Sequence, residues 1–481
     1  MLYDSISPNR ERGRSHPWVT CTWYGVLGKG GGRDMRTTSD GVSRFSAILL
    51  LCCLAGLLVR LGLGLHTSPS MVGSDAPFFR DAARVLVEEG RFTVQTPEGA
   101  KTTAKHPPAF VLLLSAGELV GLDSVAGQRV LLAVVGTGAV ALTGLAGRRL
   151  GGEAVGICAA VIAAVHPLWI QPGVIIMSET LQLTAVAGVL WAALRLVDRP
   201  DIAGAALVGA ALAVALLTRS EAAVAWLLLT PLLVTLPAIS WRRRGALTAA
   251  LCIGTAVLVG PWLIRNQVAV GSPTLSTNGG ITLAGSNCEK TYEGPNMGGF
   301  AVRCALATSG VLQLADPPDG DDRWSEVDLD AELRDFSISY MGDDKDQTLE
   351  VMGARVLRTW TPFHRQSQLD LDIAEGRLPR WQRAGRALHV VLMVPAIAGA
   401  ALAWRRSRRR TAIVAVFALQ VTIVSALVYG SSRMRVAAEP SIALLAAVGI
   451  VGAAEAWRRR RRRRRHQPSL TEIVDPAPTA G

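Results

Sequence analysis

The sequence predicts an all-α polytopic membrane protein with about 10 transmembrane helices. Half of its 481 residues are hydrophobic and only 18% are charged, a balance that soluble proteins of this size rarely show. The apolar residues are gathered into long runs, and clusters of arginine stand at the ends of several runs. These observations exclude an intrinsically disordered chain and an ordinary soluble multidomain enzyme.

The apolar runs give the expected spans, since a spanning helix needs about 20 mostly apolar residues. They lie at about 44–65, 127–147, 154–170, 180–197, 202–218, 222–240, 246–264, 386–404, 411–429 and 441–456. One further run, from Ala109 to about Leu122, is shorter and contains Glu118. We expect it to lie along the membrane surface as a juxtamembrane helix, because every arginine cluster then falls on one side.

The formal charge of +12 is unevenly distributed along the chain. The arginine clusters that adjoin apolar runs are Arg148 and Arg149; Arg242–Arg244; Arg405, Arg406 and Arg408–Arg410; and Arg458–Arg465. Such clusters mark the cytoplasmic side of a membrane protein rather than a nucleic-acid-binding surface. With the abundance of arginine and alanine typical of GC-rich bacterial genomes, they predict a multi-pass bacterial inner-membrane protein, both termini cytoplasmic, with no nucleic-acid partner.

These spans divide the chain into five parts. We expect a disordered cytoplasmic extension at 1–43, a transmembrane core at 44–264 whose first outer loop is 66–126, an extracytoplasmic loop domain at 265–384, C-terminal transmembrane helices at 385–456 and a basic cytoplasmic tail at 457–481. The loop domain carries 12 Lys and Arg against 18 Asp and Glu, as expected on the side opposite the arginine clusters. Its basic and aromatic stretch 351–383 is expected to lie against the outer lipid surface.

Polar residues of unusual kinds gather at the outer ends of the spans and in the outer loops. They are Asp75, Lys105, His106, Glu179, Arg219, Glu221, Arg265, Asn266, Arg433 and Arg435. Outside the cytoplasm a glycosyl transfer needs a donor carried on a lipid phosphate. Cations stabilise the departing phosphate there, and a carboxylate takes the proton of the attacking hydroxyl.

Six motifs in order give the chain a family resemblance over about residues 44–456. They are GSDAPFFRDAARVLVEEG (73–90), KHPPAF (105–110), HPLWI (166–170) followed by Ser178 and Glu179, LLTRSEA (216–222), PWLIRN (261–266) and SSRMRVAAEP (431–440). The chain resembles GT-C glycosyltransferases of family 39 and the aminoarabinose-transferase type, in their actinobacterial form. Phe79 stands where the family usually has Tyr. The resemblance implies the GT-C fold and a polyprenyl-phosphate sugar as donor.

The resemblance also implies roles for individual residues. Asp75 is expected to be the catalytic base and Glu179 a second carboxylate of the site, although each also stands where a helix-capping residue is common. The residues expected to bind the donor phosphate or the substrate are Lys105, His106, Arg219, Arg265, Asn266, Arg433 and Arg435. Arg265 and Arg435 are preferred among the arginines, and contacts to lipid headgroups or helix-end carbonyls are the alternative for each.

Two further expectations concern the outer loops. Cys288 and Cys304 lie in an oxidising compartment, so a disulfide between them is expected. His106 with Asp75 and Glu179 would be the ligands of a divalent ion, which some GT-C enzymes use. No ligand spacing supports such an ion, and no metal or other cofactor is assigned.

The sequence therefore predicts a glycosyltransferase that moves a hexosyl or pentosyl group from a polyprenyl-phosphate donor to a glycan, lipid or protein acceptor outside the cytoplasm. Asp75 would act as the base, and the anomeric configuration would be inverted. The alternative is a transporter or flippase of a lipid-linked sugar. Against it stand the lack of inverted repeats and of charged residues near the middle of the spans.

Overall fold

The computed structural model describes residues 37–96, 99–235, 239–313 and 325–465. Within the described residues, the part from Arg44 onward forms one compact unit. The predicted N-terminal extension lies mostly outside the described residues, and helix α1 (Thr37–His66) begins before the predicted boundary at 44. The end of the predicted C-terminal tail also lies outside them, while helix α19 (Glu439–Arg465) continues the last span through its arginine run.

The long helices confirm the predicted fold class of a multi-pass α-helical membrane protein. In the described part of the chain, seven helices are long and apolar enough to cross a membrane. They are α1, α4 (Val125–Gly151), α7 (Glu179–Asp198), α10 (Trp241–Val270), α17 (Pro379–Arg406), α18 (Arg408–Leu427) and α19.

The remaining predicted spans are bent or short. Helices α5 (Glu153–Val165) and α6 (Pro167–Val174) make an eighth candidate, bent by 45° where the extended backbone of His166 precedes a proline. Helices α8 (Ile202–Thr218) and α9 (Ala222–Val234) are apolar but shorter than the seven. The count of ten spans therefore stays a prediction.

Short side chains fix where several of these helices begin. The side chains of Ser124, Asp201, Ser240 and Ser407 each accept a hydrogen bond from a backbone N–H in the first turn of α4, α8, α10 and α18. Each bond satisfies one of the donors that a helix leaves unpaired at its N-terminus. The polar residues between the apolar runs are thus the start signals of the helices.

Three of the arginine clusters meet at one end of the bundle. The carboxylate of Asp198 pairs with Arg149 at 2.6 Å and with Arg410 at 2.7 Å. Arg243 donates to the carbonyl of Pro200, and Arg409 donates to the carbonyl of Leu232. We call this end the arginine-rich end and the other the loop end. The placement agrees with the charge pattern from which the sidedness of the membrane was predicted.

The first loop lies at the loop end and contains helix α2 (Ala76–Glu89), strands β1 (Thr93–Thr96) and β2 (Gly99–Thr102), and helix α3 (Ala109–Glu118). The strands pair antiparallel. Near the start of α4, Arg129 donates to the carbonyls of Gly64 and Thr67 at the end of α1. Since α1 ends where α4 begins, the short helix α3 between them does not cross the bundle; it packs against α2.

Glycines allow the closest helix crossings. A Cβ atom at Gly399 of α17 would lie 1.9 Å from the carbonyl oxygen of Leu445 in α19, and one at Gly449 would lie 2.0 Å from that of Pro395. Between α8 and α10, a Cβ at Gly209 would lie 2.1 Å from the carbonyl oxygen of Leu251. Small residues permit such approach in membranes, where packing rather than water exclusion holds helices together.

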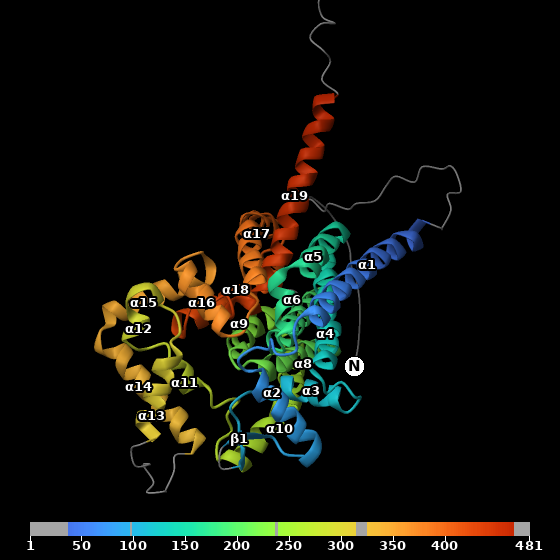
Figure 1. The fold of residues 1–481 in the computed structure, drawn as a ribbon. Helices are drawn as coiled ribbons and strands as arrows, with labels where there is room; N and C mark the ends of the chain where they lie inside the picture. The colour runs from blue at the N-terminus through green and yellow to red at the C-terminus, as the bar shows by residue number, and fades with distance from the viewer. Residues whose placement is uncertain (1–36, 97–98, 236–238, 314–324, 466–481) are drawn as a thin grey trace, which may run out of the picture. The chain divides into compact units, whose positions relative to one another are not determined.

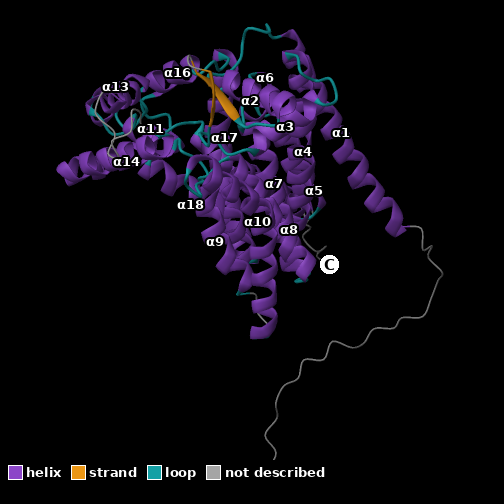
Figure 2. Ribbon diagram, turned by 90° about the horizontal axis from the view of Figure 1, so that it is seen from below, coloured by secondary structure: helices purple, strands orange, loops and turns teal. Residues whose placement is uncertain are grey.

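Between α10 and α17 the chain forms a helical loop domain, which Figure 1 shows in yellow and orange beside the long helices. Its elements are α11 (Gly279–Ala284), α12 (Glu289–Tyr292), η1 (Gly294–Asn296), α13 (Val302–Gln313), α14 (Glu326–Asp343), α15 (Lys345–Trp360) and α16 (Arg365–Ala374). A disulfide joins Cys288 to Cys304. Figure 2 shows the helices of this domain joined by loops, and the short strands of the first loop near α2.

The expectation that 351–383 lies on the lipid surface is wrong for its central arginines. Arg355 is 0% exposed and Arg358 is 2% exposed. Arg355 donates to the carbonyl of Ser286, and Arg358 to the carbonyls of Pro295 and Met297. Because these guanidinium groups donate to backbone carbonyls inside the protein, the face of α15 that carries them is buried rather than spread on the membrane.

Candidate active site

Asp75 lies at the start of α2 but does not cap it. Its side chain makes no capping hydrogen bond to the first turn of the helix. The carboxylate instead accepts a hydrogen bond from Nη2 of Arg433 at 2.5 Å and remains 27% exposed. The capping interpretation is therefore wrong for Asp75, whose carboxylate is held by an arginine from the other end of the sequence.

Arg433 is the centre of a group of ionic contacts at the loop end. Besides Asp75, its guanidinium reaches Glu179 at 2.8 Å and Glu375 at 3.5 Å. These three carboxylates come from α2, α7 and the end of α16, and Arg433 precedes the short helix η2 (Met434–Ala438). We call Arg433 with its three carboxylates the Arg433 cluster. It joins the first loop, the core and the loop domain.

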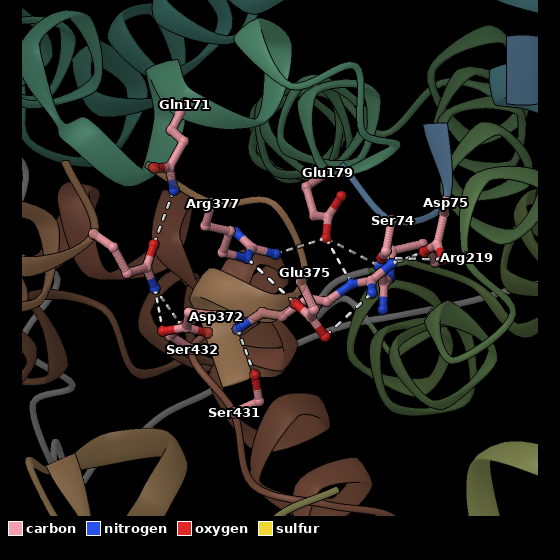
Figure 3. Close-up of polar contacts among 12 residues, drawn as sticks. Ser74, Asp75, Gln171, Glu179, Arg219, Asp372, Glu375, Arg377, Ser431 and Ser432 are labelled. Atoms are coloured by element: carbon pink, nitrogen blue, oxygen red, sulfur yellow. Dashed lines mark hydrogen bonds and ion pairs between the residues drawn. The ribbon is translucent and has the colours of Figure 1, made fainter. Parts of the chain in front are cut away.

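Glu179 is the buried member of the cluster. It is 0% exposed, and besides Arg433 it contacts Arg377 at 3.1 Å and Arg219 at 3.7 Å. Figure 3 shows Arg377 and Arg219 approaching Glu179 from opposite sides, with Glu375 below it. Arg219 also pairs with Glu221 at 2.5 Å. A carboxylate enclosed by three arginines can fix their positions but presents no surface to a substrate.

The pKa values of the two partly exposed acids of the cluster are shifted in opposite directions. Burial alone would raise the pKa of Asp75, but Arg433, His106 and Lys105 together hold it well below its usual range. Burial raises the pKa of Glu375 above its usual range even though Arg433 and Arg377 lie beside it. Asp75 therefore stays ionised more firmly than Glu375, which accepts a proton more readily.

Lys105 and His106 lie beside Asp75. The His106 ring contacts the rings of Phe78 and Phe79, with centroids 4.8 Å and 5.1 Å away. Burial lowers the pKa of His106 to about 4 despite the neighbouring charge of Asp75, so the imidazole is neutral near pH 7. The Lys105 side chain is exposed, and its ammonium lies 5.9 Å from the centre of the Phe78 ring.

The structure does not bring Arg265 and Asn266 to the Arg433 cluster. The Arg265 guanidinium donates to the carbonyls of Thr103 and Phe92, at 2.7 Å and 2.8 Å, and stacks near Trp262. Asn266 is buried and donates to the carbonyl of Thr274. Since Thr103 stands two residues before Lys105, Arg265 holds the segment that carries Lys105 and His106.

Arg435 likewise lies away from Asp75, although it is only two residues from Arg433. Its Nε donates to Glu439 at 2.8 Å and its Nη1 to the carbonyl of Thr359 at 2.7 Å. The same Glu439 carboxylate lies 3.8 Å from His166 and 3.7 Å from His389. Nη2 of Arg435 is buried and has no hydrogen-bond partner within the described residues.

A second polar network lies behind the cluster. Gln382 donates to Asp372 at 2.6 Å and to Ser432 at 2.8 Å, and it accepts from Gln171 at 2.9 Å. Asp372 and Gln382 are 0% exposed. Figure 3 shows Gln171, Asp372 and Ser432 grouped to one side of Arg377 and Glu179. This network fixes the turn around Ser432 and, through it, the position of Arg433.

Sequence reasoning missed Glu375, Arg377 and Asp372, which supply charge to this region. All three lie in the stretch that was assigned to the lipid surface. Their spacing could have indicated a site. Two acids and an arginine lie within six residues just before a span, whereas contact with lipid headgroups would need only single arginines. Among the described residues, no three His, Cys, Asp or Glu side chains are arranged to hold a metal ion.

The arrangement has the parts needed for group transfer at a membrane surface. Asp75 offers an ionised and partly exposed carboxylate, and Arg433 fixes its orientation. Lys105 offers an exposed cation beside it, and the neutral His106 ring can exchange a hydrogen bond there. A carboxylate can take a proton from an attacking hydroxyl, and a cation can stabilise a departing phosphate.

A family model described as dolichyl-phosphate-mannose-protein mannosyltransferase matches residues 105–264. The matched segment includes Lys105, His106, Glu179 and Arg219, but neither Asp75 nor Arg433. A comparison with curated proteins found no match.

Solved membrane enzymes are similar in structure. The archaeal oligosaccharyltransferase AglB from Archaeoglobus fulgidus, in complex with an inhibitory peptide and a dolichol-phosphate, matches with a TM-score of 0.51 and 13% identity, over 89% of this chain and 52% of that one. The chain thus spans about half the length of AglB. ArnT from Cupriavidus metallidurans, bound to undecaprenyl phosphate, matches with a TM-score of 0.39 and 16% identity, over 86% of this chain and 78% of that one. Because AglB is only 13% identical in sequence to this chain, the match shows a similar fold alone.

Proposed function

We propose that this chain, which has the fold of the GT-C glycosyltransferases, is a membrane glycosyltransferase with a polyprenyl-phosphate-linked sugar as donor. The observation that carries the proposal is the Asp75 carboxylate, ionised, oriented by Arg433 and flanked by the exposed Lys105. A fold of this kind with such a carboxylate at the loop end of the bundle suits transfer outside the cytoplasm.

The proposed reaction uses the Asp75 carboxylate and the Lys105 ammonium. The acceptor hydroxyl gives its proton to Asp75 while its oxygen attacks the anomeric carbon of the donor sugar. The bond from the sugar to the lipid phosphate breaks, and the phosphate leaves with the electron pair. Attack opposite the leaving group inverts the anomeric configuration. Lys105 stabilises the phosphate charge that develops, because its ammonium is exposed and its charge acts on Asp75.

Several predicted residues take supporting roles in the proposal. Glu179 is a positioning residue, since it is 0% exposed and binds Arg433, Arg377 and Arg219 rather than a substrate. Arg265 positions the segment of Lys105 through its bond to Thr103. The acceptor, whether a glycan, lipid or protein, would approach the exposed side of Asp75.

The test is transfer by the purified full chain with a labelled polyprenyl-phosphate sugar. Asp75→Asn should lower the rate by about 100-fold or more, the usual contribution of a general base. The matched control is Asp81→Asn, because Asp81 is an exposed acid on the same helix, 3.5 Å from Arg84. Transfer that survives in Asp75→Asn would refute the assignment. Translocation of the intact lipid-linked sugar without bond cleavage would favour the transporter instead.

A further inference from the structure

A cavity of about 530 Å³ with a strongly basic lining lies at the loop end, between α15, α16, α17 and η2. Its arginines are Arg358, Arg365, Arg383, Arg386 and Arg435. None of the residues that line it, all within the described part of the chain, is acidic. The volume lies within the range of small-molecule sites. We call it the basic cavity.

Two buried arginines of the basic cavity lack full hydrogen bonding. Nη2 of Arg435 and Nε of Arg358 are buried without a partner in the described residues, and these side chains are 3% and 2% exposed. Burial, followed by the charge of Arg386, lowers the pKa of Arg358 to about 10. The charge of Asp372 acts on Arg358 in the opposite direction, and Asp372 lies 3.9 Å from Arg386. An unpaired buried guanidinium N–H is still costly unless an anion accepts from it.

An exposed apolar face of α17 adjoins the cavity at Val390. The α17 residues that line it are Arg383, Arg386, Ala387, His389 and Val390, so the lining changes from cationic to apolar along the helix. Val394 and Ile397 follow Val390 at spacings of four and three residues, and they are 74% and 65% exposed. The arginines lie in the first turns of the candidate span α17, and the exposed apolar residues follow them along the helix.

The turn before α19 separates the basic cavity from the Arg433 cluster. Arg433 extends to the three carboxylates, whereas Ser432 and Arg435 line the cavity. Asp372 and Gln382, both 0% exposed, fill the space behind Ser432. Lys105, the cation assigned to the donor phosphate, does not line the cavity. The loop end therefore has two separate cationic sites, one at Lys105 and one in the basic cavity.

We propose that the basic cavity binds the phosphate monoester of a second membrane lipid, whose hydrocarbon chain lies along the exposed apolar face of α17. A monoester carries up to two negative charges and three acceptor oxygens, which suits a group of five arginines. The change from arginine to exposed apolar side chains along one helix face fits a headgroup joined to a lipid tail. A water-soluble phosphate would use the arginines but not the apolar face.

The experiment is native mass spectrometry of the full chain in detergent, titrated with undecaprenyl phosphate. Two lipids should bind to the wild-type chain. Arg365→Ala with Arg383→Ala, both at exposed positions, should weaken one binding event by about tenfold or more and leave the other unchanged. The control Arg380→Ala removes an exposed arginine of the same helix that does not line the cavity, and it should bind two lipids as the wild type does.

The arms of the titration separate this proposal from the proposed function. Lys105→Ala should weaken the other binding event. If it does not, the result counts only against the role of Lys105 in binding the donor phosphate, not against the basic cavity. Inorganic phosphate should compete for the basic cavity only at concentrations about tenfold or more above the lipid, because it lacks the apolar contact. A single lipid bound to the wild type, unchanged binding in the double arginine variant, or equal competition by inorganic phosphate would each overturn the proposal.

Discussion

Removal of Arg433 should destabilise the loop end more than the loss of any single salt bridge at the surface. In Arg433→Met, Asp75, Glu179 and Glu375 lose the guanidinium they share, and only Glu179 and Glu375 keep another arginine within ion-pair distance. The side chain of Arg433 is 13% exposed, so water reaches it poorly. The change therefore leaves partly buried negative charge without compensation.

The size of the effect follows from the geometry. At about 4 Å and an effective dielectric constant of about 20, each charge pair contributes roughly 4 kcal/mol. Three pairs cannot be added, because the guanidinium loses its hydration on burial. Breaking a buried ion pair by removing one partner typically costs about 3–5 kcal/mol, and we expect a loss of free energy of unfolding in this range.

The assay is thermal unfolding of the purified chain in detergent at pH 7 and pH 5. In the wild type, the pKa of Asp75 is lower in the folded protein than in the unfolded one. The resulting stabilisation is therefore complete at pH values above the unfolded-state pKa, and it is lost only as the pH falls through the folded-state pKa. Without Arg433, burial should raise that pKa above the unfolded value, so the variant loses stability as the pH rises. The deficit should therefore be larger at pH 7 than at pH 5.

Two further variants make the reasoning refutable. Glu375→Gln in the Arg433→Met background should restore part of the stability, because Arg377 would otherwise have to compensate both Glu375 and Glu179. Arg80→Met is the matched control, since Arg80 donates to the neutral Gln128 at 2.8 Å. An Arg433→Met protein as stable as Arg80→Met, with the same deficit at both pH values, would show that the carboxylates do not depend on Arg433.

Three other predictions concern separate parts of the chain. Because burial lowers the pKa of His106 to about 4, stability that is present above pH 6.5 should fall by up to about 3 kcal/mol toward pH 4, and His106→Gln should flatten this slope in a pH series of unfolding measurements. Cys288→Ser should lower the stability of the loop domain by about 3 kcal/mol under oxidising conditions, because the disulfide to Cys304 is lost. Limited proteolysis measures the effect, and equal cleavage of the variant and the unreduced wild type would contradict the prediction. Gly399→Val should lower the unfolding temperature and Ala398→Val, at an exposed neighbouring position, should not, because only the former meets the Leu445 carbonyl.

The bundle could be predicted from the sequence because hydrophobic length and arginine placement act locally. A run of about 20 apolar residues is by itself long enough to span the membrane, and each arginine cluster by itself favours the cytoplasmic side. Helix α8 (Ile202–Thr218) has the predicted bounds, but the end of α9 could not be placed as well. Helix α9 ends at Val234, before the predicted boundary at 240. The length of an apolar run does not show where within it a helix ends.

The pairing within the site depends on contacts that sequence spacing does not encode. Asp75 and Arg433 are 358 positions apart, and nothing local distinguishes Arg433 from Arg265 as its partner. Arg265 is instead satisfied by backbone carbonyls, which any arginine at a helix end can find. The bond between Arg435 and Glu439 has a four-residue spacing, so it could have been expected from the sequence.

The short segment 431–435 explains how one end of the bundle can serve two ligands. Arg433 leaves it toward Asp75 and Glu179, while Ser432 and Arg435 face the basic cavity. The segment has little freedom, since Gln382 holds Ser432 and Glu439 holds Arg435. An anion that binds Nη2 of Arg435 therefore acts on a turn two residues from the arginine that orients the proposed base. Occupancy of the basic cavity should accordingly change the rate of transfer even where the affinity for the donor is unchanged, and Gln382→Leu, which releases Ser432, should weaken that coupling.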